Sequence, residues 1–447
     1  MKRQMWLLLA IVIAIVAGTY VYFRIAGDSW QPPRVVKIES KEPLASLFPT
    51  WIAWQSDAEE GMPQALLLRD GDYIIGKTSI PYRASDGQTL KLSFTDWQAR
   101  IGETTVAVLL NKNEGLAWLI KASGQELANV RTISLPTTIN AATLAALKRL
   151  AAANPHVDLW GESEASMLQA LPLFRPRAVF FDKQMKGALR ALANQPELET
   201  LQMEAVDPGC FEVLPTLPKL RRLIIVHWDV NKAGPLPGGL TNLKTLLVME
   251  SKGIKDLTAL RSAPAELEEL SLLGMPDLKS IDGLDKLTRL RTLALWNDNE
   301  LSDLSSLNAL TRLRWVSLPS KTTQEQFAAF ANAHPKLKIL DLMGNKNVTN
   351  LAPLSAMKGL EGLILNGPYK NLDAVRGLTS LRFLGISEKI LESSPEQVAA
   401  VRKALPDCLV VRVKPLCLGS GWLMLLVPLL GVIWLVRRQP HQEAQPS

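Results

Sequence analysis

The feature that most constrains this chain is a pattern, Leu-x-x-Leu-x-Leu, that recurs nine times with occasional Ile, Val or Met in place of a leucine. The copies begin at Leu198, Leu220, Leu243, Leu267, Leu290, Leu313, Leu337, Leu360 and Leu381. Successive copies lie 22, 23, 24, 23, 23, 24, 23 and 21 residues apart. A period of about 20 to 29 residues is typical of solenoids, in which each repeat packs only against its neighbours. We therefore expect one elongated array rather than several globular domains.

The clearest copy runs from Leu337 to Asn345, where alternate leucines predict a short strand and the asparagine predicts a turn. This pattern resembles the leucine-rich-repeat superfamily. A second apolar group in several copies, such as Leu301, Leu304 and Leu307, resembles the irregular bacterial repeats of the internalin-like subclass. That resemblance implies an extended or 3₁₀ return side. The asparagine position is otherwise held by Val206, Trp228, Ser251, Met275, Asp298, Lys321, Pro368 and Lys389.

Three strand-like segments upstream, at 130–135, 157–159 and 178–182, extend the array back to about residue 130. The segments 141–153 and 186–193 between them have helical composition, which resembles the ribonuclease-inhibitor-like subclass. A helical stretch at 395–405 and an apolar strand after it would close the far end of the core. The solenoid is expected to occupy residues 130–415.

Residues 27–129 have a different character. Strands are predicted at 65–68, 73–76, 90–94 and 105–110, and Asp-Gly pairs at Asp70-Gly71 and Asp86-Gly87 predict turns between them. We expect a small β-rich domain. It either caps the open end of the solenoid, the interpretation we favour because arrays need caps, or carries a ligand site of its own.

Two apolar segments lie near the chain ends. Residues 5–23 carry no charge and follow Lys2 and Arg3, which predicts a transmembrane signal anchor within residues 1–26 in preference to a cleaved signal peptide. Residues 416–436 predict a second transmembrane helix, with Trp422 and Trp434 near its ends and a polar tail at 437–447. The expected fold is an α/β solenoid with a small β-rich N-terminal domain and two terminal transmembrane helices.

A start-transfer segment followed by a stop-transfer segment places the residues between them outside the cytoplasm. In a bacterium, the chain would sit in the inner membrane with its bulk in the periplasm. The cell surface is the alternative, because the C-terminal segment also resembles the sorting tails of some Gram-negative surface proteins.

Composition and motifs argue against several functions. The net charge of +7, from 50 basic and 43 acidic residues, is not gathered into a basic stripe of the kind that binds nucleic acid. Three scattered cysteines and four histidines, of which only His227 lies at a strand end, form no metal-binding or nucleophilic motif. We expect no enzyme activity, no catalytic residues, no metal and no cofactor.

The side chains between the leucines should face the concave side of the arc, where such proteins bind partners. The third, fifth and seventh positions of the copies are unusually apolar in the middle of the array. The predicted partner-binding residues are Leu247, Met249, Leu273, Trp296, Trp315, Asp341 and Met343. A contiguous apolar patch with aromatic anchors favours a protein partner. Alternatively, the β-rich domain, a second copy or the bilayer covers the patch, or irregular repeats turn these side chains inward.

Two other functions stay open. The chain could be an enzyme or a glycan- or small-molecule-binding subunit that uses residues 27–129, with the repeats as scaffold. A polar cleft there would gather several of Asp57, Glu59, Glu60, Asp70, Asp72 and Asp96. A purely structural spacer is the third interpretation. The sequence predicts neither the partner nor the oligomeric state.

Overall fold

The structure is a computed structural model, and it describes residues 64–67, 73–76, 79–83, 89–94, 97–101, 103–296, 301 and 303–413. All of these residues fall in one compact unit, which ends at Val413. Within these ranges, no helix has both the length and the apolar character needed to cross a bilayer. The predicted spans at 5–23 and 416–436 and the tail at 437–447 lie outside the described residues.

One long sheet organises the described residues. Its first four strands, β3 to β6, pair antiparallel in chain order. From β6 to β19, each strand pairs in parallel with the next one along the chain. Strands β1 and β2 form a separate antiparallel pair. One parallel strand per repeat, each beside its sequence neighbour, is the architecture of a leucine-rich-repeat solenoid.

The first strands are β1 (Gln64–Leu67), β2 (Tyr73–Gly76), β3 (Ser79–Arg83), β4 (Thr89–Phe94), β5 (Gln98–Ile101), β6 (Thr104–Leu109), β7 (Thr132–Ser134), β8 (Asp158–Gly161) and β9 (Ala178–Phe181). The strands of the nine copies are β10 (Thr200–Glu204), β11 (Arg222–Val226), β12 (Thr245–Met249), β13 (Glu269–Leu273), β14 (Thr292–Trp296), β15 (Trp315–Ser317), β16 (Ile339–Met343), β17 (Gly362–Asn366) and β18 (Phe383–Ser387). Strand β19 (Leu409–Val413) ends the sheet's described part.

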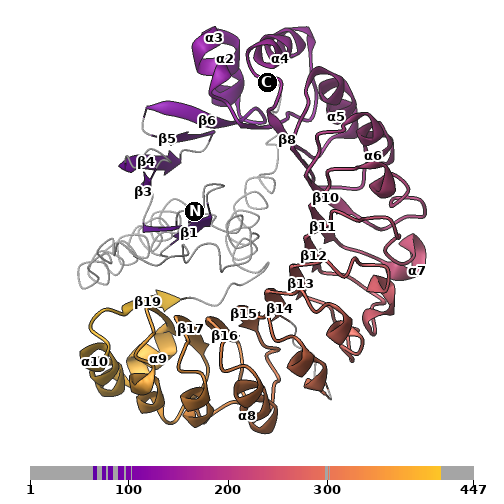
Figure 1. Ribbon diagram of the computed structural model, residues 1–447. Helices are drawn as coiled ribbons and strands as arrows, with labels where there is room; N and C mark the ends of the chain where they lie inside the picture. Colours follow the sequence, from indigo (N-terminus) through magenta and orange to yellow (C-terminus); the bar gives the residue numbers. More distant parts are fainter. Residues whose placement is uncertain are drawn as a thin grey trace, which may run out of the picture. The chain divides into compact units, whose positions relative to one another are not determined.

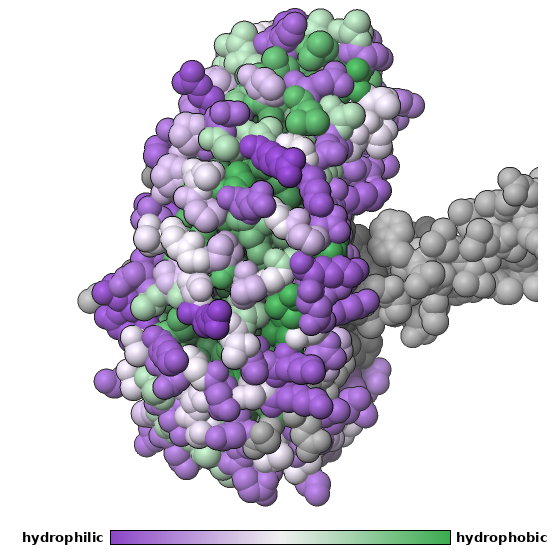
Figure 2. Space-filling model, turned by 90° about the vertical axis from the view of Figure 1, so that its right-hand side faces the viewer, coloured by the Kyte–Doolittle hydropathy of each residue, from purple (hydrophilic) through white to green (hydrophobic). Residues whose placement is uncertain are grey.

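Helices return the chain along the outer side of the repeats, and the strands line the inner side (Figure 1). The α-helices are α2 (Asn113–Lys121), α3 (Gly124–Ala128), α4 (Ala141–Ala153), α5 (Glu164–Ala170), α6 (Lys186–Ala191), α7 (Val230–Ala233), α8 (Gln324–Ala333), α9 (Glu388–Ser393) and α10 (Pro395–Ala404). The 3₁₀ helices are η3 (Leu171–Leu173), η4 (Leu192–Asn194), η5 (Leu214–Thr216), η6 (Leu257–Leu260), η7 (Leu284–Lys286), η8 (Ser305–Ala309), η9 (Ala352–Ala356) and η10 (Leu372–Gly377). Hydrophilic side chains cover most of the outer side, with smaller apolar areas between them (Figure 2).

The leucines of the pattern form the core. In every copy, the first, fourth and sixth positions are buried, as Leu243, Leu246 and Val248 are in β12 and the residues before it. The pairing keeps these positions in step, so that Leu246 lies beside Leu223 on one side and Leu270 on the other. Burying one such side chain contributes about 1.5–3 kcal/mol, and the period repeats that contribution along the array.

The asparagine turn forms where the sequence predicts it. Asn345 is fully buried after β16, and its side-chain amide donates to the carbonyl oxygens of Pro319 (3.1 Å) and Thr322 (3.2 Å). The side-chain oxygen Oδ1 of Asn345 accepts from the backbone N–H groups of Asn347 (3.1 Å) and Val348 (2.8 Å). One side chain therefore connects its own turn to the preceding repeat.

Other copies satisfy this turn differently. In two adjacent copies the position holds Trp228 and Ser251, both buried. The backbone N–H of Trp228 donates to Ser251 Oγ (3.1 Å), and that hydroxyl donates to the carbonyl of Met249 (2.8 Å). A serine hydroxyl therefore does here part of what the asparagine amide does in the Leu337 copy.

The segments upstream of the nine copies form strands β7, β8 and β9, as predicted, and the predicted helix 141–153 is α4. The copies that contain β12, β13, β14, β16 and β17 return through 3₁₀ helices, as predicted, whereas α8 follows β15 and α9 and α10 follow β18. Between residues 64 and 129 the sequence predicted four of the six described strands and neither helix. Strand β3 contains Pro81, which argues against a strand, and β5 is short and polar. Because β6 pairs with β7, the sheet continues across residue 130.

Candidate functional site

Strand register brings much of the predicted concave surface together. Met249 lies beside Leu273 in the sheet, and Leu273 lies beside Trp296. Trp315 and Asp341 lie on the adjacent strands β15 and β16, and Met343 follows on β16. The seven predicted residues therefore span five consecutive strands, β12 to β16.

The exposure of these residues differs from what the sequence led us to expect. Leu247, Leu273, Trp315 and Asp341 are buried, and Met249 is half-buried. The side chains of Trp296 and Met343 lie outside the described set. Among the predicted partner-binding residues whose side chains the structure describes, Met249 is the one that is accessible. It lies on β12, the first of the five strands.

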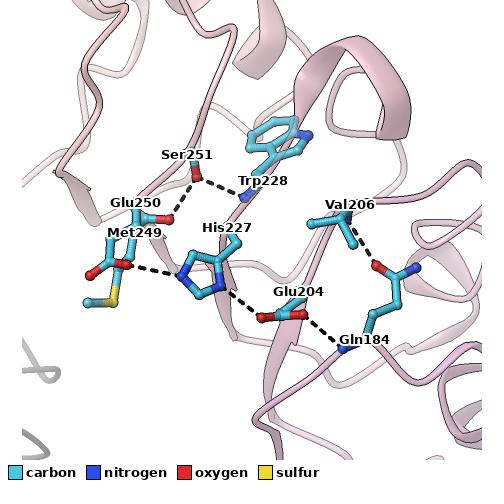
Figure 3. A network of polar contacts seen from close by, with 8 residues as sticks. All are labelled: Gln184, Glu204, Val206, His227, Trp228, Met249, Glu250 and Ser251. Carbon is cyan, nitrogen blue, oxygen red and sulfur yellow. Dashed lines mark hydrogen bonds and ion pairs between the residues drawn. The ribbon is translucent and has the colours of Figure 1, made fainter.

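Next to Met249, a polar network that the sequence did not predict joins three repeats. His227 follows β11, and its Nδ1 lies 2.8 Å from Oε1 of Glu204, the last residue of β10. Its Nε2 lies 3.0 Å from Oε2 of Glu250, which follows β12 (Figure 3). We call these three residues the carboxylate–histidine bridge.

The network continues behind Glu204. The backbone N–H of Gln184 donates to Glu204 Oε2 (2.9 Å), and Gln184 Oε1 accepts from the backbone N–H of Val206 (3.0 Å). Figure 3 shows these contacts along the ends of neighbouring strands. Glu204 is therefore the most constrained member of the bridge, with a side chain 17% exposed, whereas His227 and Glu250 are each 49% exposed.

The backbone at the bridge is strained. His227 (φ 53°) and Glu250 (φ 48°) both adopt the left-handed conformation, which side chains other than glycine rarely adopt. The equivalent positions of two later copies hold Gly274 (φ 59°) and Gly344 (φ 76°). The turn itself requires this conformation, and two consecutive copies meet the requirement with charged residues. Such strain tends to cluster at functional sites.

The bridge requires a charged imidazole. Both ring nitrogens can donate to carboxylates only when histidine is protonated. The hydrogen bond to Glu204 is the main cause that raises the pKa of His227 above its ordinary value; the bond to Glu250 adds to it, and partial burial opposes it. The protonated ring thus neutralises part of the charge of two carboxylates that would otherwise repel each other.

The edge formed by the ends of β8 to β10 is also acidic. Trp160 on β8 donates its indole N–H to Asp182, which follows β9. Burial raises the pKa of Asp182, the bond from Trp160 lowers it, and Glu162 raises it further. Lys183 pairs with Glu162 at 3.6 Å. Carboxylates outnumber cations along this edge.

The bridge gives the fold a pH dependence of known sign. Because the folded-state pKa of His227 is raised, its stabilising contribution is complete below the unfolded value of about 6.5 and is lost as pH rises through the folded value. We expect the wild-type melting temperature, minus that of His227→Gln, to fall between about pH 6 and 8. Subtraction removes the opposite effect of His334, whose pKa burial lowers. A difference that is flat or rises with pH would contradict the bridge.

No group of three or more His, Cys, Asp or Glu among the described residues has the arrangement to hold a metal ion. The carboxylates of the alternative enzyme site, Asp57, Glu59, Glu60, Asp70, Asp72 and Asp96, lie outside the described ranges, so that prediction stays a prediction.

No protein-family model matches the sequence, and no curated protein matches it. The fold is similar to the crystal structure of an internalin, InlF, from Listeria monocytogenes. That similarity covers 69% of this chain and 91% of the internalin at 17% sequence identity, with a TM-score of 0.40. The leucine-rich-repeat fold rests instead on the repeat period and on the one parallel strand that each repeat adds to the sheet.

Proposed function

We propose that this chain is a membrane-anchored leucine-rich-repeat protein that recognises a partner protein through the concave side of its solenoid. Its contact surface, which we call the recognition edge, consists of Glu204, Val226, His227, Met249 and Glu250. Solenoids with a curved parallel sheet commonly use such a surface for binding.

The observation that supports this proposal most strongly is the retained strain at the bridge. His227 and Glu250 occupy turn positions where glycine would cost nothing, and each left-handed residue costs about 1–2 kcal/mol. Both side chains are exposed, so they add little to the core. At Gly274 and Gly344 glycine makes the same turn without this strain. The bridge contacts offset part of the strain at His227 and Glu250, and a role of these side chains outside the fold would account for the rest.

The chemistry of the recognition edge defines the partner. Val226 and Met249 are half-buried apolar residues at the strand ends, beside the charged bridge. An apolar centre with a polar rim is the usual composition of a protein interface. Since carboxylates are in excess here, the partner presents an apolar side chain for Met249 and a basic group for Glu250.

The other predicted partner-binding residues lie beside Met249 or on the strands that follow it. Leu247 is buried on the same strand as Met249, and Leu273 is buried beside it in the sheet. They flank Met249 on the same face of the sheet, one on its own strand and one on the next. Trp296 and Met343 would extend the contact along the array, and the buried Trp315 and Asp341 would support it from within.

Anchoring at the membrane is part of the proposal and rests on the sequence. The apolar segments 5–23 and 416–436 flank the described unit, and a start-transfer and stop-transfer pair would place that unit in the periplasm of a bacterium. The array would then present its recognition edge to partners in the cell envelope.

We propose a binding role rather than an enzymatic one, because the bridge joins its histidine to two carboxylates with no nucleophile among its contacts. The test is site-directed photo-crosslinking of the full chain in its native membrane. Photoreactive side chains at Val226 and Met249 are compared with ones on the outer side.

A further inference from the structure

A cleft lies far from the recognition edge, at the beginning of the sheet. The β5–β6 hairpin forms one side of it, and helices α2 and α3 contribute the other. Its volume is about 460 Å³, within the range of small-molecule sites. Its lining comprises Trp97, Gln98, Arg100, Glu103, Thr104, Thr105, Trp118, Ser123, Gln125, Glu126 and Asn129.

Two indole rings form the apolar part of the lining. Trp97 precedes β5 and Trp118 lies on α2, and their ring centroids are 6.4 Å apart with the planes tilted by 43°. Both side chains are half-buried. Rings this close contact each other and leave no gap for a cation between them. They form one continuous wall, suited to the apolar face of a ligand.

The polar part of the lining is held in place. Arg100 Nη2 donates to Glu103 Oε2 at 2.7 Å, and Thr105 Oγ1 donates to Gln98 Oε1 at 3.0 Å. The pairing of β5 with β6 shifts register between Ala99 and Arg100, and such bulges often redirect side chains at binding sites.

One donor of the cleft is unused. Arg100 Nε is buried and has no hydrogen-bond partner in the part of the chain that the structure describes. A buried donor without a partner is costly and calls for an explanation. Nε is covered, so a ligand oxygen in the cleft would reach it only after a rotation of the Arg100 side chain, and the class of ligand is inferred from the rest of the lining.

The charges of the cleft exclude a strongly anionic ligand. The guanidinium of Arg100 is already paired with Glu103. Glu126 accepts from the backbone N–H (2.8 Å) and hydroxyl (2.7 Å) of Ser123, and these bonds lower the pKa of its carboxyl. The remaining lining residues are neutral hydroxyls, amides and indoles. An uncharged ligand that offers many hydroxyl groups and one apolar face fits this lining best.

We propose that this cleft binds a short neutral saccharide, with one sugar ring against Trp97 and Trp118 and its hydroxyl groups hydrogen-bonded to the amides and hydroxyls of the lining. This site is independent of the recognition edge, so either can fail without the other.

The test is isothermal titration calorimetry of the full chain in detergent with cellobiose, maltotriose and chitobiose, each up to about 10 mM. At least one should bind, and Trp118→Ala should weaken its binding about tenfold or more. Gln125→Ala, at an exposed position of the lining that leaves the core intact, should weaken it several-fold, while Leu168→Ala on the outer side should not.

No binding of any saccharide, or binding that both cleft variants retain, would overturn the proposal. Binding of choline or inorganic phosphate in preference to the saccharides, measured in the same titrations, would also overturn it. If Trp118→Ala loses its far-ultraviolet circular dichroism, Gln125→Ala alone decides the outcome.

Discussion

Replacing Trp228 by alanine is expected to lower the free energy of unfolding by about 3–5 kcal/mol, the usual cost of emptying a large aromatic site in a core. The side chain is 0% exposed. Its ring packs edge-to-face against Phe211, with centroids 5.4 Å apart, and its indole N–H donates to the carbonyl of Gly234 (3.1 Å). Alanine would remove all of these interactions and leave a cavity between two repeats.

Urea denaturation of the full chain in detergent, followed by circular dichroism and fluorescence, measures this loss. The matched control is Leu168→Ala, because Leu168 is 42% exposed on the outer helix α5 and should change stability by about 0.5 kcal/mol or less. Equal urea midpoints for the two variants would show that the buried ring of Trp228 does not stabilise the fold as expected.

The second large effect is expected at Asn345. Asn345→Leu keeps the branched shape of the side chain but removes two donated and two accepted hydrogen bonds. The carbonyl of Thr322 and the N–H of Val348 would lose that partner, whereas the carbonyl of Pro319 keeps the bonds from the N–H and hydroxyl of Thr322. Each buried group without a partner costs about 1–3 kcal/mol, so we expect a total loss of about 2 kcal/mol or more.

The nearby Asn347 provides the control. Its side chain is exposed and donates one hydrogen bond to the carbonyl of Lys321 (2.9 Å). Asn347→Ala should therefore cost about 1 kcal/mol or less in the same denaturation experiment. If Asn345→Leu costs no more than Asn347→Ala, the asparagine does not hold the turn to the preceding repeat.

The repeat period carried most of the fold prediction. A leucine pattern fixes which positions face the core, and the parallel register follows once each strand lies beside its neighbour. Helix α4 begins at Ala141 and ends at Ala153, as the sequence predicted, and the side chain of Asn140 caps its first turn. The segments that escaped prediction, such as β3 with Pro81, are stabilised by pairing in the sheet rather than by local preference.

The candidate site was predicted less well, for a physical reason. Register shows on which side of a strand a side chain points, but it does not show how much its surroundings cover it. Trp315 lies on the predicted strand position and is nevertheless fully buried. The sequence would have suggested that Trp315→Ala leaves stability unchanged, whereas its burial indicates a destabilising cavity.

The bridge was missed although the sequence contains a signal for it. The eighth position of the repeat, counted from its first leucine, is a glycine in several copies, including Gly274 and Gly344. Two consecutive copies have His227 and Glu250 there instead. A comparison of this eighth position across the nine copies would have marked His227 and Glu250 as unusual. Which atoms they contact could not be read from the sequence, because the contact to Glu204 crosses from one repeat to another.

The most direct test of the account is the photo-crosslinking of the recognition edge. Benzoylphenylalanine is placed at Val226 and Met249, and, as controls, at the exposed outer residues Ile120 and Leu168. The full chain is irradiated in its native membrane, and adducts are identified by mass spectrometry. The expected result is one partner protein crosslinked from both edge positions and from neither control. Adducts from the controls alone, or none from either edge position, would contradict recognition through this edge.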